Sequence, residues 1–205
     1  MIGIIEYGSG NVGAIMNILK QRKIAHFLSG DRSELEKADR YILPGVGAFD
    51  PTMENLTKSG IVETLNEQVL ENNKKILGIC VGMQLLAEGS DEGDHPGLGF
   101  IKGRVRLIDA SKLNRRPHLP HMGWNNIKLT NNGSLFSGID AEMGFYFLHS
   151  YYFDATNPEH VSAHVTYGSD LPCAVERDNV FGMQFHPEKS HSNGTRLLQN
   201  FAEIV

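Results

Sequence analysis

Apolar and polar positions alternate along the first half of the chain in the pattern of strands followed by helices. Residues 1–5 form a short apolar run that ends at a polar, glycine-rich turn over residues 6–10, which predicts a strand and a loop. From Asn11 onward, apolar residues recur every three or four positions, as in a helix, and residues 24–28 then read as extended. The start of the chain therefore predicts a β-α-β unit.

The same alternation continues further along the chain. Ser33 is placed to cap a short acidic helix, and residues 41–43 predict a strand that ends at Pro44, because proline cannot donate to a strand ladder. Residues 61–69 carry apolar side chains on one helical face, and residues 75–79 form an apolar run suited to a sheet covered on both faces. Strands that alternate with helices predict a mostly parallel open sheet flanked by helices.

Helical periodicity is lost after about residue 99. Only residues 197–204 again carry the apolar stripe of a helix. The segment between contains four strand-like runs, at residues 104–108, 145–153, 161–167 and 180–185. There is no internal repeat and no obvious linker. We therefore expect one α/β domain over residues 1–205, with a β-rich C-terminal extension of its sheet.

Composition narrows the class of protein. Of the 205 residues, 40% are apolar and 21% are charged, and the formal net charge is -5, which is ordinary for a globular protein and disfavours nucleic-acid binding. No apolar run approaches the roughly 18 residues that a membrane span needs, and the N-terminus does not resemble a secretory signal. Two cysteines, Cys80 and Cys173, fit a reducing compartment. We expect a cytoplasmic protein that binds neither nucleic acid nor membrane.

Cys80 is the strongest candidate for a reactive group. It lies in Gly78-Ile79-Cys80-Val81-Gly82, which has the form of a nucleophile elbow with sulfur in place of the serine oxygen. An apolar strand precedes it, and a helix-compatible segment follows, whose N-terminus would favour a thiolate. A buried structural cysteine is the commoner role for a lone cysteine, but the two flanking glycines favour the nucleophile. Cys173 has no such setting and is expected in the core.

His186 is the best candidate for the base that a nucleophilic thiolate needs. It begins His186-Pro187-Glu188 at the end of a strand-like run, and residues two apart in an extended chain point the same way. The Glu188 carboxylate could then fix the tautomer of His186. The alternative is an unrelated surface pair. With Cys80, these residues would supply nucleophile, base and orienting group, gathered where parallel strands end.

A second glycine-containing turn could hold an oxyanion. Pro44-Gly45-Val46-Gly47 follows another predicted strand, so the amides of Val46 and Gly47, together with that of Val81, could stabilise the negative charge that acyl chemistry generates. A tight β-α connection is the alternative. The cysteines and histidines show no compact zinc-ligand spacing, and this chemistry requires no metal or organic cofactor.

These three motifs together resemble the class I glutamine amidotransferases, in which a Cys-His-Glu triad hydrolyses the side-chain amide of glutamine and releases ammonia. The resemblance lies in residues 44–47, 78–84 and 185–190. Three further motifs, at residues 7–11, 120–125 and 147–152, resemble glutaminase subunits of that family that serve histidine biosynthesis. The resemblance runs over essentially the whole chain.

The resemblance implies how substrate glutamine is held. It points to the side chains of Gln84 and Glu92. The backbone of Gly47 and that of His149, Ser150 and Tyr151 would also contact the substrate. From the residues alone, Gln84 could be a solvated helix residue and Glu92 part of a flexible acidic loop.

The resemblance also implies a partner. A synthase or cyclase subunit would form a heterodimer with this chain and use the ammonia to make imidazole glycerol phosphate, with Asn11, Trp124 and Lys189 at the interface. Composition alone would instead place Trp124 in the core. Ser190 is followed by residues 191–194, His-Ser-Asn-Gly, where histidine-pathway subunits often have an earlier glycine.

Other functions stay open at this point. Similar paralogues supply ammonia to nucleotide-sugar amidotransferases in surface-polysaccharide pathways, and the same triad would serve there. A cysteine peptidase or amidase could use the same elbow. A non-catalytic binding subunit is a further alternative, although no member of the expected triad is missing.

Overall fold

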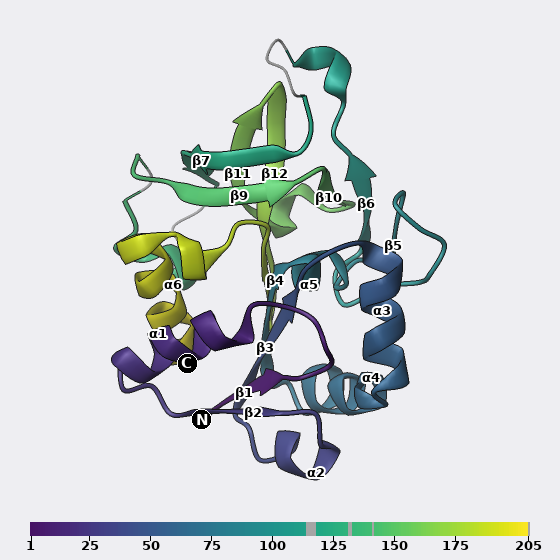
Figure 1. Cartoon of the computed structure of the whole chain (residues 1–205), viewed down its shortest axis with the longest axis vertical. Coiled ribbons are helices and arrows are strands. Elements are labelled where there is room, and N and C mark those ends of the chain that lie inside the picture. The colour runs from purple at the N-terminus through teal and green to yellow at the C-terminus, as the bar shows by residue number, and fades with distance from the viewer. Residues whose placement is uncertain (114–117, 131–132, 141, 205) are drawn as a thin grey trace.

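An eight-stranded sheet forms the centre of the computed structural model, which describes residues 1–113, 118–130, 133–140 and 142–204 (Figure 1). Its strand order is β2-β1-β3-β4-β13-β12-β11-β8. The strands are β1 (Ile2–Ile5), β2 (His26–Ser29), β3 (Arg40–Gly45), β4 (Lys75–Cys80), β8 (Ile127–Leu129), β11 (Val161–Tyr167), β12 (Ser169–Arg177) and β13 (Val180–Met183). Strands β2 to β13 in this order pair in parallel, and β12, β11 and β8 add antiparallel pairs.

Helices cover both faces of this sheet. Figure 1 shows α1 (Val12–Gln21) and α6 (His191–Glu203) on one side, and α3 (Phe49–Lys58) and α4 (Ile61–Leu65) on the other. The remaining helical elements are short: α2 (Arg32–Leu35), α5 (Val81–Gln84), the π-helix η1 (Asn66–Glu71), and the 3₁₀ turns η2 (Ala110–Lys112), η3 (Ser134–Phe136), η4 (Pro158–His160) and η5 (Pro187–Lys189). The predicted class is confirmed: an α/β fold with a mostly parallel open sheet flanked by helices and a β-rich C-terminal extension.

Two small sheets lie beside the antiparallel strands β11 and β12, in the upper part of Figure 1. One has the order β10-β6-β5 and contains β5 (Gly89–Ser90), β6 (Gly103–Leu107) and β10 (Tyr151–Ala155). The other is an antiparallel ribbon of β7 (His121–Asn125) and β9 (Phe145–His149). The strand-like run 145–153 is therefore two strands, which part at Ser150 into different sheets. This crossing brings the turn at Ser150 over the end of the large sheet.

Two local expectations were wrong. Asp31 caps α2 by accepting a hydrogen bond from the Glu34 amide, so Ser33 lies inside the helix. Strand β3 does not end before Pro44 but pairs with β4 through Pro44 to Gly45. Its pairing with β1 ends at Ile42, so Pro44 has a neighbouring strand on one side only and its missing amide breaks no ladder on the other.

None of the helices within the described residues is both long and apolar enough to cross a membrane.

Candidate active site

Cys80 ends β4 and begins a sharp turn into α5. Its backbone is in a left-handed conformation, with φ 56° and ψ −115°, which is strained for any residue with a side chain. The strand-turn-helix context of a nucleophile elbow is therefore present. Helix α5 has only four residues, fewer than the sequence suggested, so its macrodipole contributes little to stabilising a thiolate.

The two flanking glycines are required by the packing of this turn. A Cβ atom at Gly82 would lie 1.9 Å from the Leu43 carbonyl oxygen, and one at Gly78 would lie 2.6 Å from the Gly82 carbonyl oxygen. Larger residues would push α5 away from β3 and β4. The glycines thus hold Cys80 close to the turn that follows β3.

His186 and Glu188 form the predicted hydrogen bond. His186 Nδ1 lies 2.9 Å from Glu188 Oε1, and the two side chains are 5% and 2% exposed. The reason differs from the extended geometry expected, because Glu188 lies in the 3₁₀ turn η5 directly after His186. Nδ1 is committed to the carboxylate, and the buried Nε2 of His186 has no hydrogen-bond partner in the described part of the chain. Nε2 is therefore the nitrogen available for proton transfer.

The charge of His186 is set by its two neighbours. Burial lowers its pKa, but interactions with Cys80 and Glu188 more than offset burial and raise the pKa to about 9. An imidazolium is thus favoured at neutral pH, next to the sulfur of Cys80. Cys173, by contrast, is fully buried, and burial raises its pKa. Its expected place in the core is confirmed.

A pocket of about 330 Å³ opens where these elements meet. Most of the residues singled out in the sequence line it: Val46, Gly47, Cys80, Val81, Gln84, Glu92, His149, Ser150, Tyr151, His186 and Lys189. Pro120 and Leu148 complete the lining; both lie in motifs noted in the sequence, but no place in the pocket was predicted for them. Glu188 lies behind His186, while Asn11 and Trp124 do not contribute to the wall. The size suits a small molecule with polar ends.

Gln84 and Glu92 are fixed by hydrogen bonds in the wall of this pocket. Gln84 is buried, not solvated, and its Nε2 donates to Gln184 Oε1 at 3.0 Å. Glu92 is half-buried, and its Oε2 accepts from the Phe49 amide at the start of α3 at 2.8 Å. Gln184 was missed from the sequence, although it stands two residues before His186.

His149 forms the opposite wall and belongs to a buried chain of hydrogen bonds. Its Nδ1 lies 2.8 Å from the Tyr151 carbonyl, its Nε2 lies 2.9 Å from His121 Nδ1, and His121 Nε2 lies 3.2 Å from Asn125 Nδ2. Burial lowers the pKa of His149 to about 3 and that of His121 to about 4, so both rings are neutral.

The carbonyl at one end of this chain fixes every proton in it. His149 must donate from Nδ1 to the Tyr151 carbonyl and therefore accepts at Nε2. His121 then donates from Nδ1 and accepts at Nε2 from the Asn125 amide. These hydrogen bonds orient the turn at Ser150. The segment that contains His121 was noted in the sequence, but this role was not predicted for it.

The proposed oxyanion turn is held by Ser9. The Val46 amide donates to Ser9 Oγ at 3.0 Å, and Ser9 Oγ donates to the Val46 carbonyl at 3.2 Å. The Val46 amide is therefore committed outside the pocket in this conformation. Gly47 has φ 96°, and nothing lies within 4 Å of where its Cβ would stand, so this turn is both exposed and open.

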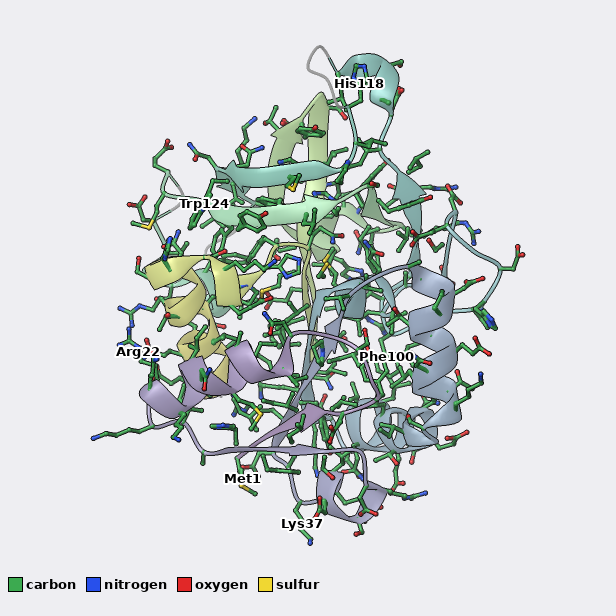
Figure 2. All side chains as sticks on the ribbon, in the orientation of Figure 1. Met1, Arg22, Lys37, Phe100, His118 and Trp124 are labelled. Carbon is green, nitrogen blue, oxygen red and sulfur yellow. The ribbon has the colours of Figure 1, made fainter. Side chains whose placement is uncertain are left out.

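Exposed apolar side chains lie on the ribbon of β7 and β9, one end of which lines the pocket through Leu148 and His149. Trp124, labelled in Figure 2, is 44% exposed, so it is not a core residue. Its ring stacks on that of His191 with centroids 5.1 Å apart. Met122 and Leu148 pair across β7 and β9 and are also exposed. Asn11 is exposed at the start of α1, and Lys189 Nζ lies 5.3 Å from the centre of the Tyr146 ring.

Comparison with known sequences gives a full-length match. The model of the family described as "Glutamine amidotransferase class-I" matches residues 4–205. A protein of Bdellovibrio bacteriovorus named imidazole glycerol phosphate synthase subunit HisH is 47% identical over 204 residues, covering 100% of both chains. The HisH subunit of Leptospira borgpetersenii is 43% identical over 204 residues, again with 100% of both chains covered.

Solved structures agree on the fold. A crystal structure titled as a glutamine amidotransferase superposes with a TM-score of 0.73 at 20% identity and covers 99% of both chains. A chain from the structure of PurLQS from Thermotoga maritima gives a TM-score of 0.71 at 19% identity, covering 98% of this chain and 97% of that one. At such identities the likeness concerns the fold alone, and the sequence relatives carry the family assignment. The chain therefore belongs to the class I glutamine amidotransferase family.

Proposed function

We propose that this chain is the glutaminase subunit of an imidazole glycerol phosphate synthase. It hydrolyses L-glutamine to glutamate and ammonia and delivers the ammonia to a cyclase partner in histidine biosynthesis. The main support is the pocket in which Cys80 and His186 face the side chains of Gln84 and Glu92. Full-length relatives that are 43% and 47% identical and carry the HisH name support the pathway. Two free cysteines fit an enzyme of the reducing cytoplasm.

The proposed reaction uses a covalent thioester. Cys80 attacks the side-chain carbonyl of glutamine, and backbone amides of Gly47 and Val81 stabilise the oxyanion. His186, protonated next to the sulfur, gives its proton from Nε2 to the departing ammonia. The now neutral His186 activates water, which hydrolyses the thioester to glutamate. Glu188 keeps the ring oriented through both steps.

Substrate recognition follows from the two polar walls. Glu92 supplies a carboxylate for the ammonium of glutamine, while Gln84 and the backbone of His149, Ser150 and Tyr151 supply neutral donors and acceptors for its other groups. No metal or organic cofactor takes part in this scheme.

The exposed apolar rim supports a docking partner. Val46 and Leu148 line the pocket and are solvent-exposed, and Met122 and Trp124 are exposed on β7, which pairs with the strand that carries Leu148. Such a patch, bordered by polar residues, is typical of an interface. We assign it to a cyclase subunit that forms a heterodimer with this chain, with Asn11 and Lys189 at its edge. The partner would receive ammonia directly above the pocket and shield it from protonation by solvent.

The two cysteines provide a matched test of the proposed chemistry. Cys80→Ala abolishes glutamate production by the complex, because the nucleophile and thioester partner are lost, whereas Cys173→Ala retains it. A glutamine-analogue electrophile labels Cys80 and spares Cys173, as mass spectrometry of the digested protein reads out. Undiminished hydrolysis by Cys80→Ala contradicts the assignment. Ammonia transfer to a purified cyclase subunit, against transfer to a nucleotide-sugar amidotransferase, decides between the two pathways.

The Ser9–Val46 hydrogen bonds suggest how the partner controls turnover. They hold the Val46 amide away from the pocket, and Gly47 lets the peptide reorient at little steric cost. We propose that docking on exposed Val46 shifts this turn toward a complete oxyanion hole. Ser9→Ala then raises the basal glutaminase activity of the isolated chain several-fold. Equal basal activity in Ser9→Ala and wild type contradicts this control.

A further inference from the structure

A buried side-chain amide lies directly behind the nucleophile. Gln184 follows β13 and is fully buried, with 0% of its surface exposed. Its Nε2 donates to Cys80 Sγ at 3.8 Å, and its Oε1 accepts from Gln84 Nε2 at 3.0 Å. Its backbone amide is fixed by the Cys173 carbonyl at 2.9 Å, so the side chain is held in place by the sheet.

The partners of Gln184 differ from those of two other buried amides, Asn193 and Asn200. Asn200 Nδ2 donates to the carbonyls of Leu135 and Ser137, and Asn193 Nδ2 likewise donates to two backbone carbonyls. Those amides brace loops. The two recorded hydrogen bonds of the Gln184 side chain instead go to the nucleophile and to a residue of the pocket wall.

The chemistry of a thiolate fixes the direction of this relay. A thiolate accepts hydrogen bonds and cannot donate them, so Nε2 of Gln184 must face Cys80. Its Oε1 then faces Gln84, which commits Gln84 Nε2 to Gln184. One of the two N–H groups of Gln84 Nε2 is thereby used, and the side chain is held with its Oε1 as an acceptor for an N–H of the substrate.

We propose that Gln184 is a further catalytic residue, which donates a hydrogen bond to the Cys80 thiolate and thereby fixes which atom of Gln84 meets the substrate. The proposal rests on the glutaminase function proposed above and adds to it two separable effects. One is electrostatic and acts on the reactivity of Cys80. The other is positional and acts on substrate binding through Gln84.

Two substitutions separate these effects. Gln184→Glu keeps an oxygen that accepts from Gln84 but places a second oxygen, with no N–H, against the sulfur. Gln184→Met removes both hydrogen bonds at similar side-chain length. Gln68→Met is the matched control, because Gln68 is also buried but lies in η1 on another part of the fold.

The kinetic readout is kcat and KM for glutamine in the complex with the cognate cyclase subunit. Gln184→Glu lowers kcat at least tenfold and leaves KM within about twofold, because Gln84 keeps its orientation. Gln184→Met lowers kcat and also raises KM, for a combined loss of about 10- to 100-fold in kcat/KM, the range of a lost hydrogen bond to a charged group. Gln68→Met matches wild type.

The second readout is the rate of Cys80 alkylation by iodoacetamide as a function of pH, measured in a Cys173→Ala background. The midpoint moves to higher pH in both Gln184 variants and stays in place for Gln68→Met. Circular dichroism and thermal unfolding verify that each variant is folded.

The outcomes distinguish the two proposals. Unchanged kinetics and an unchanged alkylation profile in folded Gln184→Glu overturn the role of Gln184. Failure of both Gln184 variants to fold, while Gln68→Met folds, also overturns it, since Gln184 is then a structural residue. A wild-type complex that hydrolyses no glutamine, yet shows the alkylation shift in Gln184→Glu, defeats the glutaminase function and leaves the hydrogen bond to Cys80 standing.

Discussion

His186 and His149 line the same pocket and are almost equally buried, yet their pKa values are shifted in opposite directions from the ordinary value for histidine. The pKa of His186 is raised to about 9, whereas that of His149 is lowered to about 3. Burial favours the neutral ring in both cases. His186 faces Glu188 and Cys80, which favour the cation, while His149 faces neutral His121 and a carbonyl. Burial lowers the pKa of both rings, and the charged neighbours of His186 reverse the direction of its shift.

The difference extends to the regions that hold the two rings. His186 follows β13, in the parallel part of the large sheet, and lies beside the strained turn of Cys80. His149 ends β9, in the small ribbon, where each ring nitrogen is already paired. His186, at the edge of the large sheet, can thus transfer a proton, whereas His149, in the ribbon, holds one wall of the pocket in place.

The largest expected effect separates the two histidines by activity. His186→Gln lowers glutamine turnover by about 10³-fold or more, because proton transfer to the leaving ammonia is lost. His149→Gln acts mainly through KM, by about tenfold, because the turn at Ser150 loosens. Steady-state kinetics of both complexes give the comparison. Similar kcat losses in the two variants contradict the division of roles.

Glu188→Gln has the next largest effect. It removes the charge that favours the imidazolium but keeps a polar partner for Nδ1, so turnover falls about 10- to 100-fold and the pKa of His186 drops by at least about one unit. NMR titration of ring-labelled histidine measures that pKa. The titration of His121, whose lowered pKa comes from burial, serves as the internal control and stays unchanged. A His186 pKa that does not respond points to Cys80 as its main determinant.

The pH dependence of stability tests the opposite signs. The pKa of His186 in the folded protein lies above the ordinary value of about 6.5, so His186 contributes to the free energy of unfolding below pH 6.5. About 2 kcal/mol of this contribution is lost as the pH rises from 7 to 9. His149 and His121 have lowered folded pKa values, so each contributes above pH 6.5 and loses about 2 kcal/mol as pH falls from 7 to 5.

Urea unfolding at pH 5, 7 and 9 measures these contributions. His149→Gln reduces the loss of unfolding free energy on the acid side only, and His186→Gln reduces the loss on the alkaline side only. Identical pH profiles for wild type and both variants remove the basis of the comparison.

The smallest effect is expected at the outer end of the histidine chain. Asn125→Ala leaves Nε2 of His121 without its donor, so KM for glutamine rises a few-fold while kcat stays near wild type. Nitrogen chemical shifts of labelled histidine report the tautomers. They show a protonated Nδ1 on both His121 and His149 in wild type, and a mixture at His121 in the variant. An unmixed His121 tautomer in Asn125→Ala means that the carbonyl of Tyr151 suffices to fix the chain.

Local patterns predicted the parallel half of the fold well. Strands β1 and β4 are short apolar runs, and α1 has a clear apolar stripe. Several elements escaped detection, namely α3, β5, β7, β8 and β12. Helix α3 carries Pro51 and several polar residues, and β12 contains Pro172 among mixed polar and apolar residues, so neither shows a clean period.

The residues of the candidate site also fall into two groups, those that the sequence predicted and those that it did not. Cys80 and its flanking glycines can be predicted from the sequence because a nucleophile elbow is a local motif of five residues. The pairing of Glu188 with His186 can be predicted because the two residues are two positions apart in the sequence. Gln184 was missed, since its two partners lie 100 and 104 residues away in the chain. A single buried glutamine carries no periodic signal.

The sequence by itself determined the fold class, the elbow and the His186–Glu188 pair, because each depends on a repeating pattern or on residues close in the chain. Only the tertiary structure decided that β13 lies beside β4, which brings His186 to Cys80, and that the ribbon carries His149 to the opposite wall. It also decided the two protonation states. These depend on how deeply each ring is buried and on which distant groups it meets, Cys80 at His186 and His121 at His149, and neither can be read from residues close in the chain.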